Sequence, residues 1–174
     1  DASKDLGKIQ AKVLLINPNI RPFQFTFEIF MTYQGFFPLG LGYLTSFIEK
    51  HGYETKILDA FSDNFSQADI NAAIKEFAPD VVGMASPTNH EFGIGTIKAC
   101  KAIDPKIVTV LGGLTPTFMS REIMEHVPEL DYIISGEGEV PFLYLLRALE
   151  GEMKVDDIKG LVHICHYLKP GTHL

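Results

Sequence analysis

Small and hydroxylated residues gather at four places along this chain, each directly after a short run of apolar residues. These segments are Asn17-Pro18, Ser86-Pro87-Thr88, Gly112-Gly113-Leu114-Thr115-Pro116-Thr117 and Gly136-Glu137-Gly138-Glu139. Glycine lets a ligand approach the backbone closely, and backbone N–H groups with hydroxyls suit phosphate and ribose oxygens. Each segment taken alone is equally typical of a tight turn or a helix cap. Their shared position after apolar runs favours a ligand site.

The elements that would position these segments follow from alternating apolar and amphipathic stretches. Strands are predicted at Lys12–Asn17, Thr55–Ala60, Val81–Ala85, Ile107–Leu111 and Tyr132–Ser135. Helices are predicted at Leu39–Gly52, Ser66–Phe77, Glu91–Ile103, Ser120–His126 and Val140–Glu150. A helix after every strand indicates parallel strands with right-handed crossovers. The predicted fold class is α/β, a doubly wound, five-stranded parallel sheet of the flavodoxin-like (Rossmann-like) type with strand order 2-1-3-4-5.

In an open parallel sheet, ligands bind beyond the carboxyl ends of the strands, which brings the four small-residue segments to one edge. The first predicted helix should place Leu39, Tyr43, Leu44, Phe47 and Ile48 on one apolar face. Ser66 followed by Asp69 resembles a capping box at the start of the second helix.

The connection Pro18–Pro38 is too long for an ordinary strand-to-helix loop and is rich in aromatic residues. Those residues are Phe23, Phe25, Phe27, Phe30, Tyr33, Phe36 and Phe37. Loops in contact with water rarely carry so many aromatic side chains, so this segment is expected to cover something apolar. Two interpretations stay open: a lid or subunit interface, and a broad floor for a flat macrocycle that a partner domain closes from the other side.

Composition and charge limit the function classes. The 174 residues fit one domain. The formal net charge of −7 without a Lys/Arg cluster argues against nucleic-acid binding. No apolar stretch approaches the ~20 residues of a membrane span. Cys100 and Cys165 lie far apart, which predicts no disulfide framework and a cytoplasmic location. Cys100 is expected to be a small buried hydrophobe.

Three parts of the chain are distinguished. Residues 1–11 form a polar N-terminal tail, 12–151 the ligand-binding domain, and 152–174 a peripheral strand, Ile158–Cys165, with the start of a linker. Near the C-terminus, His163, Cys165, His166 and His173 cluster. We interpret them as an alternating strand and tail and predict no metal site there.

Several nucleotide-binding motifs do not match. Gly40-x-Gly42-x-x-Thr45 falls within a predicted helix instead of a turn after a strand, so a dinucleotide fingerprint is not indicated. No Gly-x-x-x-x-Gly-Lys-Ser/Thr phosphate loop occurs. Ala85-Ser86 stands where a response-regulator receiver carries an aspartate.

The chain resembles the cobalamin-binding domain that precedes the radical S-adenosylmethionine (SAM) domain in a large enzyme family. The ordered segments that carry the resemblance are Lys12–Pro18 (KVLLINP), Pro38–Leu44 (PLGLGYL), Glu49–Tyr53 (EKHGY), Asp80–Gly83 (DVVG), Leu111–Gly113 with Pro116-Thr117, Asp131–Glu139 (DYIISGEGE) and Lys159–Val162 (KGLV). The resemblance covers nearly everything between Lys12 and Val162.

The resemblance implies cobalamin as cofactor and assigns residues to it. The dimethylbenzimidazole tail would enter near Ser86, Thr88, Gly112 and Gly113. Its phosphate, ribose and base would meet Thr115, Pro116, Thr117, Gly136, Glu137 and Gly138. The corrin would lie against Asn17, Pro18 and the segment Gln34–Leu39, which includes Gln34, Gly35, Phe37 and Leu39.

Two departures from related groups shape the expected chemistry. Methionine-synthase-like domains carry Asp-x-His-x-x-Gly after the first strand, whereas Asn17 to Lys50 contains no histidine here. Cobalamin is therefore expected without a histidine ligand, and the resemblance implies that it binds base-off. The Cys-x-x-x-Cys-x-x-Cys motif of an iron–sulfur cluster is also missing. S-adenosylmethionine, the cluster and all catalytic residues are expected in a C-terminal radical SAM domain beyond this chain.

Three functions remain open from the sequence. The first is the cofactor-holding module of an enzyme that transfers a methyl group to a substrate radical. The second is the corresponding part of an anaerobic magnesium-protoporphyrin-type oxidative cyclase. The third is a flavodoxin-like interaction module that has lost its cofactor.

Overall fold

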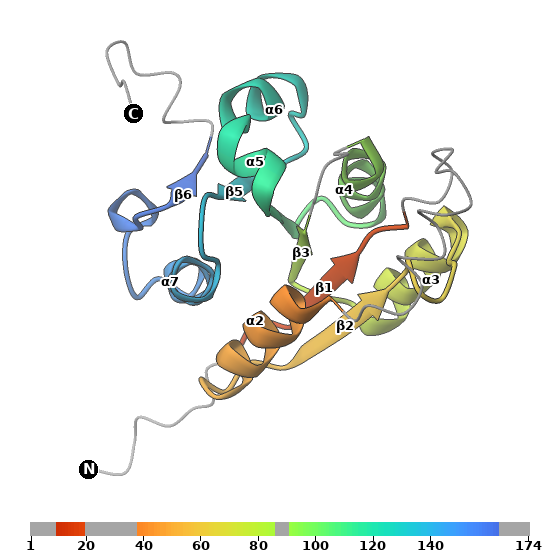
Figure 1. Ribbon diagram of the computed structural model, residues 1–174. Helices are drawn as coiled ribbons and strands as arrows, with labels where there is room; N and C mark the ends of the chain where they lie inside the picture. Colours follow the sequence, from red (N-terminus) through yellow and green to blue (C-terminus); the bar gives the residue numbers. More distant parts are fainter. Residues whose placement is uncertain (1–9, 20–37, 86–90, 164–174) are drawn as a thin grey trace.

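The computed structural model describes residues 10–19, 38–85 and 91–163 (Figure 1). Its strands are β1 (Val13–Asn17), β2 (Thr55–Asp59), β3 (Val81–Ala85), β4 (Val108–Gly112), β5 (Tyr132–Ile134) and β6 (Leu161–Val162). Its helices are α2 (Leu39–Glu49), α3 (Gln67–Phe77), α4 (Glu91–Ile103), α5 (Leu114–Phe118), α6 (Ser120–His126) and α7 (Glu139–Leu149), with the 3₁₀ turn η1 (Val155–Asp157).

The strands form one sheet in the order β2-β1-β3-β4-β5-β6. The first five are parallel, and β6 pairs antiparallel with β5 at the edge, Ile134 opposite Leu161. The predicted α/β class and the order 2-1-3-4-5 are thus confirmed. The sixth strand is present as well, and within the described range it is limited to two residues.

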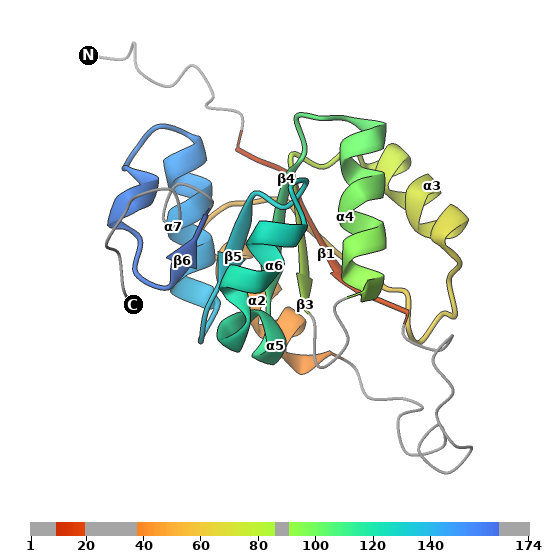
Figure 2. The same cartoon turned by 90° about the horizontal axis from the view of Figure 1, so that it is seen from above.

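Helices cover both faces of the sheet because successive apolar side chains along each buried strand point to opposite faces. Leu14 and Ile16 belong to a core with residues of α3, α4 and α6, whereas Val13 and Leu15 belong to a core with residues of α2 and α7. Figure 1 shows α3 and α4 on one side of the sheet and α2 and α7 on the other. The arrowheads of β1 and β3 in Figure 2 point to the edge at which α2 begins and α5 lies.

The capping box at α3 is confirmed. The Ser66 side chain accepts a hydrogen bond from the backbone N–H of Asp69, and the Asp69 carboxylate accepts one from the backbone N–H of Ser66. Hydrogen bonds from Ser66 also lower the pKa of Asp69. The N–H groups of Ser66 and Asp69 at this helix start are therefore both satisfied.

Two local predictions were wrong. Thr115–Thr117, expected as a loop, lie in the short helix α5, where Pro116 occupies the first turn and so removes no intrahelical hydrogen bond. On α2, Leu39 and Tyr43 are exposed, while Leu41 and Ile48 are buried. The true apolar face is rotated toward Leu41 because α2 packs against both the sheet and α7.

Cys100 is fully buried in the core beside α3 and α6, as expected. Burial raises the pKa of its thiol to about 12, so it is a neutral packing residue at neutral pH. No helix within the described ranges is both long and apolar enough to cross a bilayer.

The amino edge of the sheet is held by a hydrogen-bonded ion pair. The Lys101 Nζ atom lies 2.6 Å from Asp131 Oδ2 and also donates to the carbonyl of Ile107 at 2.7 Å. The same Asp131 oxygen accepts the backbone N–H of Thr109 at 2.8 Å and the Thr109 hydroxyl at 3.0 Å. One carboxylate thus joins α4, β4 and the start of β5.

We expect Asp131→Ala to lower the free energy of unfolding by about 1–3 kcal/mol, because the N–H of Thr109 loses its partner in a partly buried site. Glu125→Ala removes an exposed pair with Arg121 and should cost no more than about 0.5 kcal/mol. Urea denaturation of both variants measures the difference. Equal losses would contradict the role assigned to Asp131.

Candidate functional site

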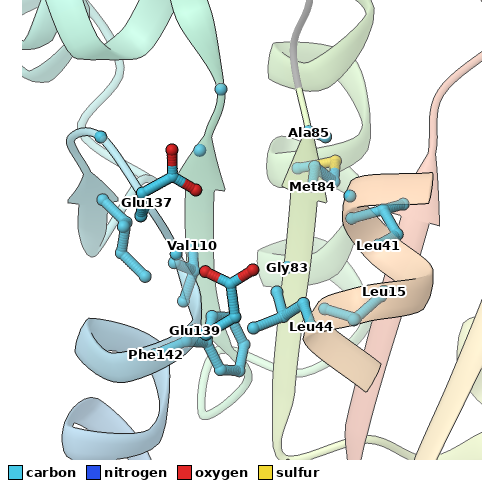
Figure 3. A pocket seen from close by; sticks show the side chains of 16 residues that line it. Leu15, Leu41, Leu44, Gly83, Met84, Ala85, Val110, Glu137, Glu139 and Phe142 are labelled. Atoms are coloured by element: carbon cyan, nitrogen blue, oxygen red, sulfur yellow. The ribbon is translucent and has the colours of Figure 1, made fainter. Parts of the chain in front are cut away.

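A pocket of about 210 Å³ opens at the carboxyl edge of the sheet, on the face covered by α2 and α7 (Figure 3). Its walls come from β1, β3, β4, β5, α2, α7 and the loops that follow β4 and β5. The lining residues are Leu15, Gly40, Leu41, Leu44, Gly83, Met84, Ala85, Val110, Gly112, Gly113, Ile134, Gly136, Glu137, Gly138, Glu139 and Phe142.

Glycines keep the rim of this pocket open. A Cβ atom placed on Gly40, Gly136 or Gly138 would meet no atom within 4 Å. A Cβ on Gly112 would meet only the carbonyl oxygen of Ile134, at 3.9 Å. Side chains at these positions would therefore project into free space, and their absence leaves a cradle that a ligand can fill.

Gly83 creates the depth of the pocket. It lies inside β3, where a side chain on this face would point toward α7. A Cβ there would come within 2.7 Å of Leu15 Cδ2 and 3.1 Å of Phe142 Cε2. The missing side chain lets Phe142 approach the strand, and this ring forms one wall.

Two carboxylates are the only charged side chains among the described residues of the lining. Glu137 and Glu139 follow β5 and reach toward the pocket from the start of α7 (Figure 3). Neither carboxylate has a hydrogen-bond or ion-pair partner within the described ranges. They can accept hydrogen bonds from a ligand, while the rest of the lining side chains are apolar.

Thr117 connects two of the loops around the pocket. Its hydroxyl donates to the carbonyl of Gly113 at 2.7 Å and accepts the backbone N–H of Gly136 at 3.0 Å. Gly113 has φ = 107°, a conformation suited to glycine, and this residue turns the chain from β4 into α5. Thr117 therefore fixes the spacing of the two glycine segments and does not line the pocket itself.

The structure brings together five of the predicted cofactor residues in the pocket lining: Gly112, Gly113, Gly136, Glu137 and Gly138. Leu39 lies beside them at the start of α2. Thr115, Pro116 and Thr117 lie in α5, behind the lining. Gln34, Gly35, Phe37, Ser86 and Thr88 fall outside the described ranges, as does most of the aromatic connection.

Asn17 and Pro18 lie at the same edge, outside the pocket. The Asn17 amide donates to Asp59 Oδ1 at 2.7 Å, and that oxygen also accepts the backbone N–H of Ser62 at 3.2 Å. Pro18 borders a separate hollow on the other face, with Asn19, Phe65 and Thr96. Asn17, the last residue of β1, is thus held in a fixed orientation.

Sequence reasoning missed most of the pocket walls. Leu15, Leu41, Leu44, Val110, Ile134 and Phe142 read as core residues, and Gly40 and Gly83 were not assigned to the site. The sequence does carry a signal that Glu139 belongs to the site, because the Gly-Glu pair at 136–137 is repeated at 138–139. Gly83 is also visible as a glycine in the middle of an apolar strand, a position that often marks close approach.

Exposed apolar side chains surround the mouth of the pocket. Leu39 is 69% exposed, Leu114 64% and Val140 48%. Each is the immediate chain neighbour of a lining residue, namely Gly40, Gly113 and Glu139. Tyr43, next to the lining residue Leu44, and Phe118, at the end of α5, are exposed as well. Such a group of exposed side chains indicates a surface that covers an apolar partner.

No group of three or more His, Cys, Asp or Glu side chains that could hold a metal ion occurs in the part of the chain that the structure describes. His163 contacts Asp156 at 3.1 Å. Cys165, His166 and His173 lie outside the described ranges.

This fold, with a glycine-lined pocket at the carboxyl edge, matches a known class of cofactor-binding domains. The B12 binding domain model matches residues 32–146, two thirds of the chain. The chain belongs to the B12-binding domain family, and the resemblance stated from the sequence is confirmed.

Relatives within this family are longer enzymes. Cytidylyl-2-hydroxyethylphosphonate methyltransferase of Streptomyces wedmorensis is 32% identical over 169 residues, which cover 86% of this chain and 30% of that protein. Anaerobic magnesium-protoporphyrin IX monomethyl ester cyclase of Rubrivivax gelatinosus is 33% identical over 115 residues, 65% of this chain and 21% of the cyclase. This chain thus spans less than a third of the length of either relative.

The fold also matches a solved structure. The cobalamin-dependent S-adenosylmethionine radical enzyme OxsB, with aqua-cobalamin and S-adenosylmethionine bound, superimposes with a TM-score of 0.76 at 18% identity. The match covers 90% of this chain and 21% of OxsB.

We expect Gly83→Ala to destabilise the domain by about 1–3 kcal/mol, because the added methyl group overpacks against Leu15 and Phe142. Gly93→Ala is the matched control: its methyl group meets only Leu111 Cδ1, at an ordinary 3.5 Å, within α4. This variant should be neutral or stabilised by up to about 1 kcal/mol. Denaturant unfolding compares the two, and a neutral Gly83→Ala would contradict the close approach of Phe142.

Proposed function

We propose that this chain holds cobalamin with its nucleotide tail in the glycine-lined pocket and its corrin ring across the carboxyl edge of the sheet. The open pocket carries this proposal, because a domain without a ligand would gain stability by filling it with side chains. The glycine cradle at Gly40, Gly112, Gly136 and Gly138 fits a flat, bulky group that approaches the backbone closely.

The apolar rim supports the position of the corrin ring. Leu39, Leu114 and Val140 offer exposed apolar contacts around the pocket mouth, where a ring attached to a buried tail would emerge. Gly35, Phe37 and the aromatic connection belong to the same proposed floor. A domain that had lost its cofactor would have no reason to keep both an open pocket and this rim.

We assign the bound cofactor to the base-off form without a histidine ligand. A nucleotide base that occupies the pocket cannot coordinate the cobalt from below. No histidine follows β1 before His51, and the described histidines, His51, His126 and His163, do not line the pocket. The polar group held at the end of β1 is the Asn17 amide, oriented by Asp59.

We propose that the whole protein, of which this chain is the cofactor-binding domain, catalyses methyl transfer. The methyltransferase relative that aligns with 86% of the chain supports this proposal. When bound, the cobalt of cobalamin would carry a methyl group from S-adenosylmethionine to a substrate radical. The residues of this chain would bind and orient the cofactor, and the apolar rim would exclude water from the ring. Residues 12–151 would form the binding domain, and 152–174 would lead to a radical SAM domain that holds the iron–sulfur cluster.

Binding is tested by mixing the purified chain with hydroxocobalamin, removing free ligand by desalting and recording the visible spectrum. A one-to-one complex with a base-off spectrum is expected. After reduction to cobalt(II), the paramagnetic resonance spectrum should lack splitting from an axial nitrogen. A colourless protein would overturn cofactor binding, and nitrogen splitting would overturn the coordination without overturning binding.

We expect Gly138→Leu to weaken hydroxocobalamin binding at least about tenfold with little change in melting temperature, because the new side chain fills free space in the pocket. Gly138 has an ordinary φ of −89°. Gly113 is a poorer probe, since its φ of 107° strains any side chain. Gly95→Leu is the control. Gly95 is exposed on α4, on the opposite face of the sheet, so this variant should bind cobalamin normally. Equal affinities would contradict the placement of the tail.

A further inference from the structure

We infer that the pocket selects among cobamides by their lower base, accepting a benzimidazole or phenol-type base and discriminating against a purine. The inference rests on the proposed function and concerns the chemistry of the pocket interior. A purine differs from a benzimidazole of similar shape mainly by its additional ring nitrogens and exocyclic polar groups. The pocket would have to pair each of those groups to hold a purine well.

The interior walls offer no such pairing. The side chains that enclose the pocket are hydrocarbon or thioether groups: Leu15, Leu41, Leu44, Met84, Val110, Ile134 and Phe142. Among the residues that the structure describes, no hydroxyl, amide or imidazole side chain lines the pocket. An apolar bicyclic ring gains contact with these walls, whereas adenine nitrogens would lose their water without replacement.

The backbone of the lining is largely occupied as well. Gly83 and Gly112 lie within the parallel ladders of β3, β4 and β5. The N–H of Gly136 donates to the Thr117 hydroxyl, and the carbonyl of Gly138 accepts the N–H of Phe142. These glycines therefore supply mainly space. The free N–H groups in the first turns of α2 and α7 lie at the rim, beside Gly40 and Glu139, and not along the interior walls.

The two carboxylates do not alter this preference. Glu137 and Glu139 come directly after the end of β5, at the carboxyl edge, where the sugar of a buried nucleotide would pass. As carboxylates they only accept hydrogen bonds, which suits ribose hydroxyls and the amide N–H groups on a corrin. A ring nitrogen with a lone pair would gain nothing from either carboxylate, and the amino group of an adenine buried against the apolar walls would lie too deep to donate to them.

The test compares four corrinoids on the same protein by equilibrium dialysis with visible detection. These are hydroxocobalamin, the adenine-based cobamide, the cresol-based cobamide, and cobinamide, which has no nucleotide tail. The cobalamin and cresol forms should bind within a few-fold of each other. The adenine form should bind at least about tenfold more weakly, the cost of about one unpaired buried polar group.

The outcomes separate this inference from the proposed function. Adenine-based cobamide that binds as tightly as cobalamin would overturn the base selectivity while cobalamin binding stands. No binding of any corrinoid would overturn the proposed function. Cobinamide that binds as tightly as cobalamin would show that the tail stays outside the pocket, and this result would overturn both.

The variant Leu44→Gln gives an independent test of the base selectivity. Leu44 lies on α2, is half-buried and lines the pocket, so a glutamine there supplies both a donor and an acceptor. The ratio of adenine-form to cobalamin affinity should rise about tenfold. Leu149→Gln, at the far end of α7 and outside the lining, is the control and should leave the ratio unchanged. A folded Leu44→Gln protein with an unchanged ratio would overturn the inference.

Discussion

The architecture of the site depends on one packing constraint, the missing side chain at Gly83 on the α2/α7 face of β3. In an α/β sheet, helices pack as close as the side chains between them allow. Without a Cβ on Gly83, Leu15 and Phe142 fill the layer beneath the pocket and nothing fills the layer above it. The parallel order of β3, β4 and β5 then brings the glycine segments after β4 and β5 to the edge of this gap.

The opposite face of the sheet shows what the same strands do without this constraint. There Leu14, Ile16, Val82 and Leu111 are almost fully buried against α3 and α4, and Cys100 contributes only volume. Packing of this kind supplies stability, whereas an open apolar pocket withholds it. One face of the sheet therefore stabilises the domain, and the other gives up some stability for a binding site.

The fold was predictable because its signals are local. Apolar runs of strand length, helical periodicity and the Ser66–Asp69 cap all depend on neighbours in sequence. The pocket walls were not predictable in this way, since Leu15, Val110 and Phe142 have the pattern of any core residue. Their role appears only in the folded structure, where the missing side chain of Gly83 lets Leu15 and Phe142 pack close to the strand. Leu39 and Tyr43 misled the prediction of the α2 face because apolar residues around a ligand site imitate a core-facing stripe.

The two edges of the sheet also differ in how their polar groups are satisfied. At the amino edge, Asp131 receives hydrogen bonds from Lys101 and Thr109, so this carboxylate is used within the protein. At the carboxyl edge, Glu137 and Glu139 remain without protein partners in the described ranges, beside exposed apolar side chains. An open apolar pocket and exposed apolar side chains at the same edge are costs that folding alone does not require. Both costs are removed by a single ligand that has an apolar base and a ring large enough to cover the rim, while the two carboxylates are free to accept hydrogen bonds from its sugar.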